Sequence, residues 1–143
     1  MKNWWKSFKT FWRLSRLNKV DSLKIAIYLT FFWFTLKMVP FNKFIRLYNY
    51  ILRNHKSTNY NISRVQEITQ TIKTVSRYLV FDSTCLTQAL TAKLILRSIP
   101  DLVLTIGVSL VNGFEAHAWI EKDRMYIIGD TPSSHFTPIW CIE

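Results

Sequence analysis

Residues 82–97 read Asp82-Ser83-Thr84-Cys85-Leu86-Thr87-Gln88-Ala89-Leu90-Thr91-Ala92-Lys93-Leu94-Ile95-Leu96-Arg97. The apolar residues recur at helical spacing, two cations occupy the last turns, and Pro100 follows, so this stretch predicts a helix. Three residues in a row, Asp82-Ser83-Thr84, can cap it, and Cys85 lies in the first turn whichever of them does. Free backbone N–H groups and the positive end of the helix dipole favour a thiolate at that position.

After this helix the apolar pattern takes the period of two that is typical of strands. Leu102 to Leu110 alternates, Asn112-Gly113 is a strong signal for a two-residue hairpin turn, and Phe114 to Glu121 returns. Met125 to Gly129 follows as a third strand. The sequence therefore predicts an α+β fold in which the cysteine-bearing helix packs on an antiparallel sheet.

The first 80 residues read as helices. An amphipathic helix is expected in residues 1–20, a second from Asp21 or Ser22 to about Met38, a third over Phe41 to Arg53, and a fourth from Ile62 to about Leu79. We divide the chain into residues 1–80, a basic and aromatic-rich helical part, and residues 81–143, a catalytic core.

Charge follows the same division. Residues 1–80 contain 15 Lys and Arg against 2 Asp and Glu, whereas residues 81–143 contain 4 against 7. This asymmetry indicates a binding face for something acidic: a nucleic acid, an anionic membrane surface or an acidic peptide. The aromatic stripe in residues 1–20 can pack on the next helix or contact a membrane surface.

Three observations bear on the compartment. The longest apolar run, Ile25 to Leu36, is 12 residues, shorter than a membrane span. No signal peptide is visible, and two cysteines, Cys85 and Cys141, are too few for a disulfide framework. We expect a soluble cytoplasmic protein.

Cys85, His117 and Asp130 follow one another in an order that suits a thiol nucleophile, its base and the group that orients the base. With Asn112-Gly113 as a two-residue turn, His117 lies opposite Val108 on the apolar face that the helix would cover. With Asp123-Arg124 as the second turn, Asp130 lies directly opposite His117; with Lys122-Asp123 it is a diagonal neighbour on the same face.

Taken singly, each of the three residues fits a purely structural role as well: a small buried cysteine, a core histidine and a turn aspartate. Together they favour a cysteine-dependent hydrolase or acyltransferase, with His135 as the alternative base. A zinc site from Cys85, His117, His135 and Cys141 is less favoured, because no Cys-x-x-Cys or His-x-x-x-His pair is present. No cofactor is expected.

Several segments resemble the lasso-peptide leader peptidases of the transglutaminase-like superfamily, which have a papain-related Cys-His-Asp core. The resemblance runs from about Ile25 to Asp130. It rests on Ser76-Arg77-Tyr78, Thr84-Cys85-Leu86-Thr87-Gln88-Ala89-Leu90, Leu94-Ile95-Leu96-Arg97-Ser98-Ile99-Pro100, Ile106-Gly107-Val108 and Ala116-His117-Ala118-Trp119-Ile120-Glu121. The family often has Gly where Arg124 stands, so the second turn departs from its pattern.

The resemblance implies a cysteine peptidase that removes the leader from a ribosomally made precursor. The implied partners are the leader, a separate winged-helix recognition protein and an asparagine-synthetase-like cyclase, with no nucleic acid. Cys85, His117 and Asp130 would be the catalytic residues. An amide-forming acyltransferase of the same superfamily and a non-catalytic adaptor on membrane surfaces or nucleic acid are the alternatives.

Overall fold

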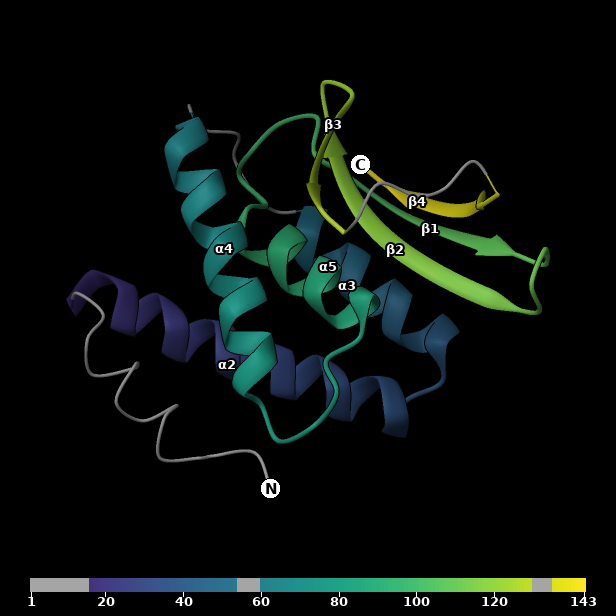
Figure 1. The fold of residues 1–143 in the computed structure, drawn as a ribbon, viewed down its shortest axis with the longest axis horizontal. Helices are drawn as coiled ribbons and strands as arrows, with labels where there is room; N and C mark the ends of the chain where they lie inside the picture. Colours follow the sequence, from purple (N-terminus) through teal and green to yellow (C-terminus); the bar gives the residue numbers. More distant parts are fainter. Residues whose placement is uncertain (1–15, 54–59, 130–134) are drawn as a thin grey trace.

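The computed structural model describes residues 16–53, 60–129 and 135–143 (Figure 1). Its helices are α2 (Arg16–Met38), α3 (Phe41–Arg53), α4 (Ile62–Tyr78) and α5 (Cys85–Ile95). They precede an antiparallel sheet made of β1 (Val103–Ser109), β2 (Glu115–Lys122), β3 (Met125–Ile128) and β4 (Thr137–Ile142). The strands lie in the order β3-β2-β1-β4. The predicted α+β architecture is confirmed.

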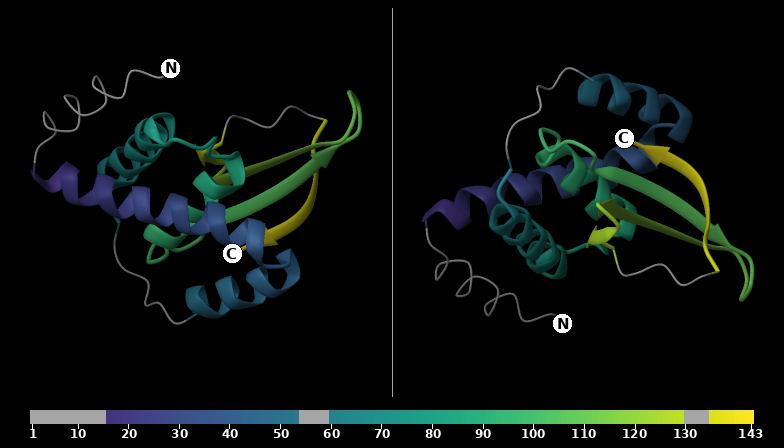
Figure 2. Two further views of the ribbon diagram at one scale, coloured as in Figure 1. Left: turned by 90° about the horizontal axis from the view of Figure 1, so that it is seen from below. Right: turned by 90° about the horizontal axis from the view of Figure 1, so that it is seen from above.

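The cysteine-bearing helix occupies the middle of the molecule. α5 lies between the sheet and α2 (Figure 1), and it packs on both. α3 and α4 flank α2 on opposite sides (Figure 2). Buried aliphatic side chains fill the space between α5 and the sheet: Ala89, Leu90, Ala92, Leu104, Ile106, Ala118, Ile120, Ile128 and Ile142. α5 is therefore held on two sides, which fixes the position of its first turn.

Aromatic rings join α2, α3 and α5. Phe32 on α2 makes edge contacts with Phe44 and Tyr48 on α3, at centroid distances of 5.9 and 5.7 Å. The Tyr48 hydroxyl donates a 2.7 Å hydrogen bond to the backbone oxygen of Leu90 on α5. Burial raises the pKa of Tyr48, so this hydroxyl stays a donor. A buried tyrosine thus satisfies its polar end while it ties α3 to the cysteine helix.

The helix limits agree with the predictions except at the end of α5, which stops at Ile95 and not at Arg97, and at the start of α2. α3 spans the predicted residues, and α4 ends one residue before the predicted limit. α2 is already helical at Arg16, so neither Asp21 nor Ser22 caps it, contrary to expectation. The Asp21 carboxylate instead accepts a 2.6 Å hydrogen bond from Arg64 on α4. The helix predicted in residues 1–20 lies mostly outside the described residues.

The first hairpin differs from the two-residue turn predicted at Asn112-Gly113. Ser109 pairs with Glu115, so the five residues 110–114 connect the strands. A two-residue type I′ turn needs positive φ at both central residues. Gly113 has φ 102°, but Asn112 is not among the residues with positive φ. The asparagine–glycine pair therefore belongs to a longer loop.

This loop shifts the predicted register by one residue. His117 lies opposite Gly107, not opposite Val108. Opposed residues of antiparallel strands share a face, so His117 is on the face of Trp119, while Ala118 and Ile120 take the face covered by α5. The prediction that His117 projects from the apolar face under the helix is wrong.

The second turn is the two-residue turn predicted at Asp123-Arg124. Lys122 pairs with Met125, and the two turn residues have φ of 50° and 63°, as a type I′ turn requires. The register then shifts between Ile120 and Glu121. The predicted opposition of His117 and Asp130 assumed the same register along the whole of β2 and β3. The shift in register therefore removes the basis of that prediction.

β4 was not predicted. It pairs with the outer edge of β1, where Pro138 is tolerated because an edge strand leaves half of its N–H groups unpaired. None of the helices in the described part of the chain has the length and hydrophobicity that a membrane span requires.

Candidate functional site

Cys85 is the first residue of α5. Thr84 caps the helix, and its side-chain oxygen accepts a 3.3 Å hydrogen bond from the backbone N–H of Thr87. The Thr84 carbonyl accepts the first helical bond, from Gln88 at 3.1 Å. In the first turn of a helix the backbone N–H groups have no partner within the helix and carry the positive end of its dipole. The predicted first-turn position of Cys85 is confirmed, and negative charge is favoured there.

Cys85 and His117 line one cavity of about 510 Å³. Both side chains are half-buried, and they come from elements far apart in the chain, the start of α5 and the strand β2. Gly129, the last residue described after β3, lines the same cavity. The structure therefore brings two of the three predicted catalytic residues to one site. Asp130 lies outside the described residues, and its role stays a prediction.

Aromatic neighbours hold the His117 ring. It stacks on the indole of Trp119 with a centroid distance of 5.9 Å and an interplanar angle of 22°. The ring of Phe136 lies 5.6 Å from it on centroids, at 46°. Trp119 is only 4% exposed, so the platform under the imidazole is itself fixed.

Two glycines make room for that platform. A Cβ at Gly107 would lie 2.8 Å from Cη2 of Trp119, and a Cβ at Gly129 would lie 2.8 Å from its Cβ. Gly129 also has φ 86°, a conformation that other residues rarely adopt. The close approach of the indole to β1 thus depends on glycine at position 107, and the close approach of the Trp119 backbone to the end of β3 depends on glycine at position 129.

Polar side chains of α4 and α5 also line the cavity. Lys73 and Arg77, one turn apart on α4, line it together with Gln88 of α5. Neither cation forms an ion pair within the described residues. The Gln88 side-chain amide donates a 3.3 Å hydrogen bond to the backbone oxygen of Ser83, which anchors it beside the cysteine.

These polar residues were missed as site residues from the sequence. Gln88 follows Cys85 by three positions, which places both on one helix face and could have singled it out. Lys73 and Arg77 gave no such signal, because only the packing of α4 beside α5 brings them to the cysteine.

A second cavity of about 270 Å³ runs between α4 and β3. Val65, Met125 and Tyr126 line it, and Lys73 lines both cavities. The two hollows therefore share α4 as a wall.

The other candidate residues lie elsewhere. His135 is exposed and does not line the cavity that holds Cys85, so its role as the alternative base gains no support. Cys141 on β4 is exposed, and both cysteines are free thiols. Among the described residues, no three His, Cys, Asp or Glu side chains are grouped as they would be around a metal ion.

Comparison with known proteins identifies the family. Residues 36–141 match the model of the transglutaminase-like superfamily, a range that runs from the end of α2 to β4 and includes Cys85 and His117. No curated protein and no solved structure matches the chain. The matched range covers well over half of the sequence and contains both the cysteine helix and the sheet. The chain therefore belongs to the transglutaminase-like superfamily.

Proposed function

We propose that this protein is a cysteine peptidase that removes the leader from a ribosomally synthesised precursor during lasso peptide maturation. The observation that carries the proposal is the shared cavity of Cys85, at the N-terminus of α5, and His117 on β2. Membership of the superfamily supports cysteine-dependent acyl chemistry. The leader-peptidase assignment rests on the sequence resemblance.

The reaction would proceed by two acyl transfers. The Cys85 sulfur attacks the scissile carbonyl carbon, the carbon–nitrogen bond breaks, and His117 delivers a proton to the leaving amine. Water then attacks the thioester, His117 takes its proton, and the cysteine leaves as thiolate. Asp130 would orient the imidazole and stabilise its protonated form.

The oxyanion would be stabilised at the start of α5. The backbone N–H of Cys85 belongs to the first turn, where it has no partner within the helix. Gln88 would supply a second donor, because one N–H of its amide binds Ser83 and no acceptor for the other is found among the described residues. Donors fixed before the reaction are the kind that stabilise a tetrahedral intermediate.

The charge of the cavity favours a substrate with a negative group near the bond that is cut. Lys73 and Arg77 line the cavity without ion-pair partners in the described part of the chain, and Asp82 is the carboxylate that offsets them there. Two cations against one carboxylate attract an anionic side chain in a partly desolvated site.

We place the reaction in the cytoplasm, with the leader presented by a winged-helix recognition protein and the product passed to an asparagine-synthetase-like cyclase. A gene for a short precursor next to those for these two proteins would agree with this assignment.

The test is cleavage of such a precursor by the purified chain together with the recognition protein, followed by mass spectrometry. We expect Cys85→Ala and His117→Ala each to lower the rate by orders of magnitude, whereas Cys141→Ser serves as the matched cysteine control and keeps it. Cleavage by Cys85→Ala at the wild-type rate would refute the proposal.

The same products distinguish the rival reaction. An amide-forming acyltransferase uses the same cysteine and histidine but yields a peptide joined to an amine. Free leader indicates hydrolysis, and a joined product indicates transfer.

A further inference from the structure

α2 carries two apolar stripes on opposite faces. One is buried and includes Ile25, Leu29 and Phe32. The other faces outward, and its members are 54–67% exposed: Val20, Leu23, Ile27, Phe31, Phe34 and Met38. Their spacing of three and four residues keeps them on one side along the length of the helix. A contiguous exposed apolar patch commonly marks a contact with another molecule or with a membrane, so we ask what covers the outer stripe.

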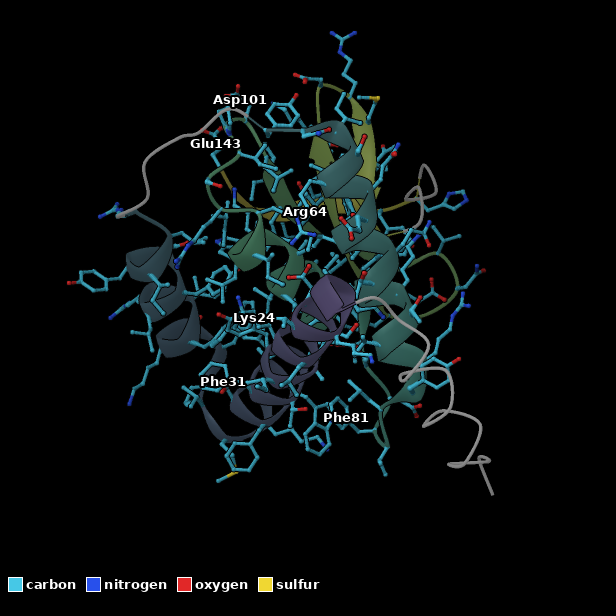
Figure 3. All side chains as sticks on the ribbon, turned by 90° about the vertical axis from the view of Figure 1, so that its left-hand side faces the viewer. Lys24, Phe31, Arg64, Phe81, Asp101 and Glu143 are labelled. Atoms are coloured by element: carbon cyan, nitrogen blue, oxygen red, sulfur yellow. The ribbon has the colours of Figure 1, made fainter. Side chains whose placement is uncertain are left out.

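α3 continues this apolar surface. Leu47 and Ile51 of α3 are exposed, and they line a groove of about 380 Å³ with Ile27 and Phe31 of α2. We call the outer stripe of α2 together with Leu47 and Ile51 the α2–α3 face. Figure 3 shows Phe31 on the α3 side of α2 and Phe81, which lines the catalytic cavity, on the other side. The face and the cavity therefore point in different directions.

Positive charge borders the α2–α3 face. Described cations of these two helices are Lys19, Lys24, Lys37, Lys43, Arg46 and Arg53. The one acidic residue in the described residues of α2 and α3 is Asp21, and Arg64 already neutralises it at 2.6 Å. An apolar stripe between cations, with no uncompensated carboxylate on these two described helices, complements a surface that is apolar inside and anionic at its boundary.

We propose that the α2–α3 face docks on an anionic lipid surface, with α2 lying in the plane of the interface. The outer stripe of α2 runs from Val20 to Met38, which is about 27 Å at 1.5 Å per residue. A long apolar stripe with flanking Lys and Arg is the arrangement by which helices lie at the boundary of headgroups and acyl chains. No helix in the described residues is suited to cross the bilayer, so docking is peripheral. The catalytic cavity, on the other side of α2, stays open to substrate.

The experiment is co-sedimentation of the full chain with vesicles of phosphatidylcholine, alone or mixed with phosphatidylglycerol. We expect binding to the mixed vesicles and weaker binding to phosphatidylcholine alone, with the difference reduced at high salt. The double variant Ile27→Glu with Phe31→Glu should bind at least about tenfold more weakly, because it places two charges in the apolar groove. Substitution of Lys43, Arg46 and Arg53 by Gln, which removes three of these six cations, should reduce the preference for anionic vesicles.

Matched controls separate this face from exposed apolar residues in general. Val111 and Phe114, in the loop between β1 and β2, are 65 and 75% exposed and lie far from α2. Val111→Glu with Phe114→Glu should leave vesicle binding unchanged. Circular dichroism confirms that each variant is folded, and the side chains changed in α2, α3 and this loop are solvent-exposed.

Three outcomes would overturn the proposal. The first is that the wild-type chain does not bind mixed vesicles. The second is that the Ile27→Glu, Phe31→Glu variant binds as well as wild type, while substitution of Trp4 and Trp5 abolishes binding; the N-terminal segment would then be the lipid contact. The third is that the wild-type chain is a dimer without lipid and the double variant a monomer, since a second copy would then cover the face. The test needs no cleavage activity, so it stands apart from the proposed peptidase function.

Discussion

The position of His117 can be tested through a residue on the neighbouring strand. Gly107 lies opposite His117 in the register of β1 and β2, and the Trp119 indole lies over it. A methyl group at this position would be 2.8 Å from Cη2 and 2.9 Å from Cζ3 of that indole. The substitution Gly107→Ala therefore pushes on the ring that stacks with His117.

The size of the effect follows from these distances. Carbon atoms in contact are normally about 3.5 Å apart or more, so the indole must move by roughly 0.7 Å. Overpacking of a core costs about 1–3 kcal/mol, and replacement of glycine by alanine returns up to about 1 kcal/mol through the unfolded chain. The net loss should be about 1–2 kcal/mol, which lowers the urea midpoint by about 0.5–1 M for an m-value near 2 kcal/mol/M.

A double-mutant cycle with Trp119→Phe isolates the cause. Phenylalanine lacks both indole atoms that meet the new methyl group, so Gly107→Ala should cost little in that background, where the remaining tight contact is with Cβ of Phe136 at 3.3 Å. Urea denaturation of the four proteins gives the coupling energy, which we expect to be about 1–2 kcal/mol. Cleavage by Gly107→Ala should also fall, because a shift of about 1 Å in a catalytic group can cost about a hundredfold in rate. An equal loss of stability in both backgrounds would refute the reasoning.

Three further predictions concern a buried lysine, the second turn and the polar wall of the cavity. Burial lowers the pKa of Lys93 to about 8 from 10.5. Above pH 8 the unfolded chain therefore binds one proton more than the folded chain, and the free energy of unfolding rises with pH, by about 2 kcal/mol from pH 7 to 9.5. Lys93→Met should abolish this rise in denaturation curves, and an identical rise in the variant would contradict the prediction. Arg124 has φ 63°, so Arg124→Gly should stabilise the fold by about 0.5–1 kcal/mol in thermal melts whereas Arg124→Ala should not; equal melting of the two variants would argue against strain. In the double variant Lys73→Gln, Arg77→Gln, the rate at which anionic iodoacetate alkylates Cys85, divided by the rate for neutral iodoacetamide, should fall. Peptide mapping measures both rates. An unchanged ratio would show that these two cations do not set the charge of the cavity.

The helices and the cysteine position could be predicted because their signals are local. Capping residues, apolar spacing and Pro100 define α5 from neighbouring positions alone. The early start of α2 could not be predicted in this way. Aspartate is a residue type that commonly caps helices, but the Asp21 carboxylate accepts a hydrogen bond from Arg64 on α4. That contact joins residues 43 positions apart, so it is not visible in the local sequence.

The register of the sheet could be predicted only where the turn was short. Asp123-Arg124 forms the expected turn, but a bulge just before it, between Ile120 and Glu121, shifts the pairing. At Asn112-Gly113 the chain uses a five-residue loop, and the resulting one-residue shift places His117 on the other face. Bulges and loop lengths depend on packing between strands, and the sequence of one strand does not contain that information. β4 was not predicted because it contains Pro138, which argues against a strand, and because its alternating apolar pattern is short.

The arrangement of α4 has an evolutionary consequence. This helix forms a wall of both cavities, and Lys73 faces each of them, yet α4 contributes neither Cys85 nor His117. Its outward positions can therefore change without disturbing the core between α5 and the sheet. Relatives that process different substrates could diverge mainly along this one helix, while the cysteine, the histidine and the glycines around Trp119 stay under constraint.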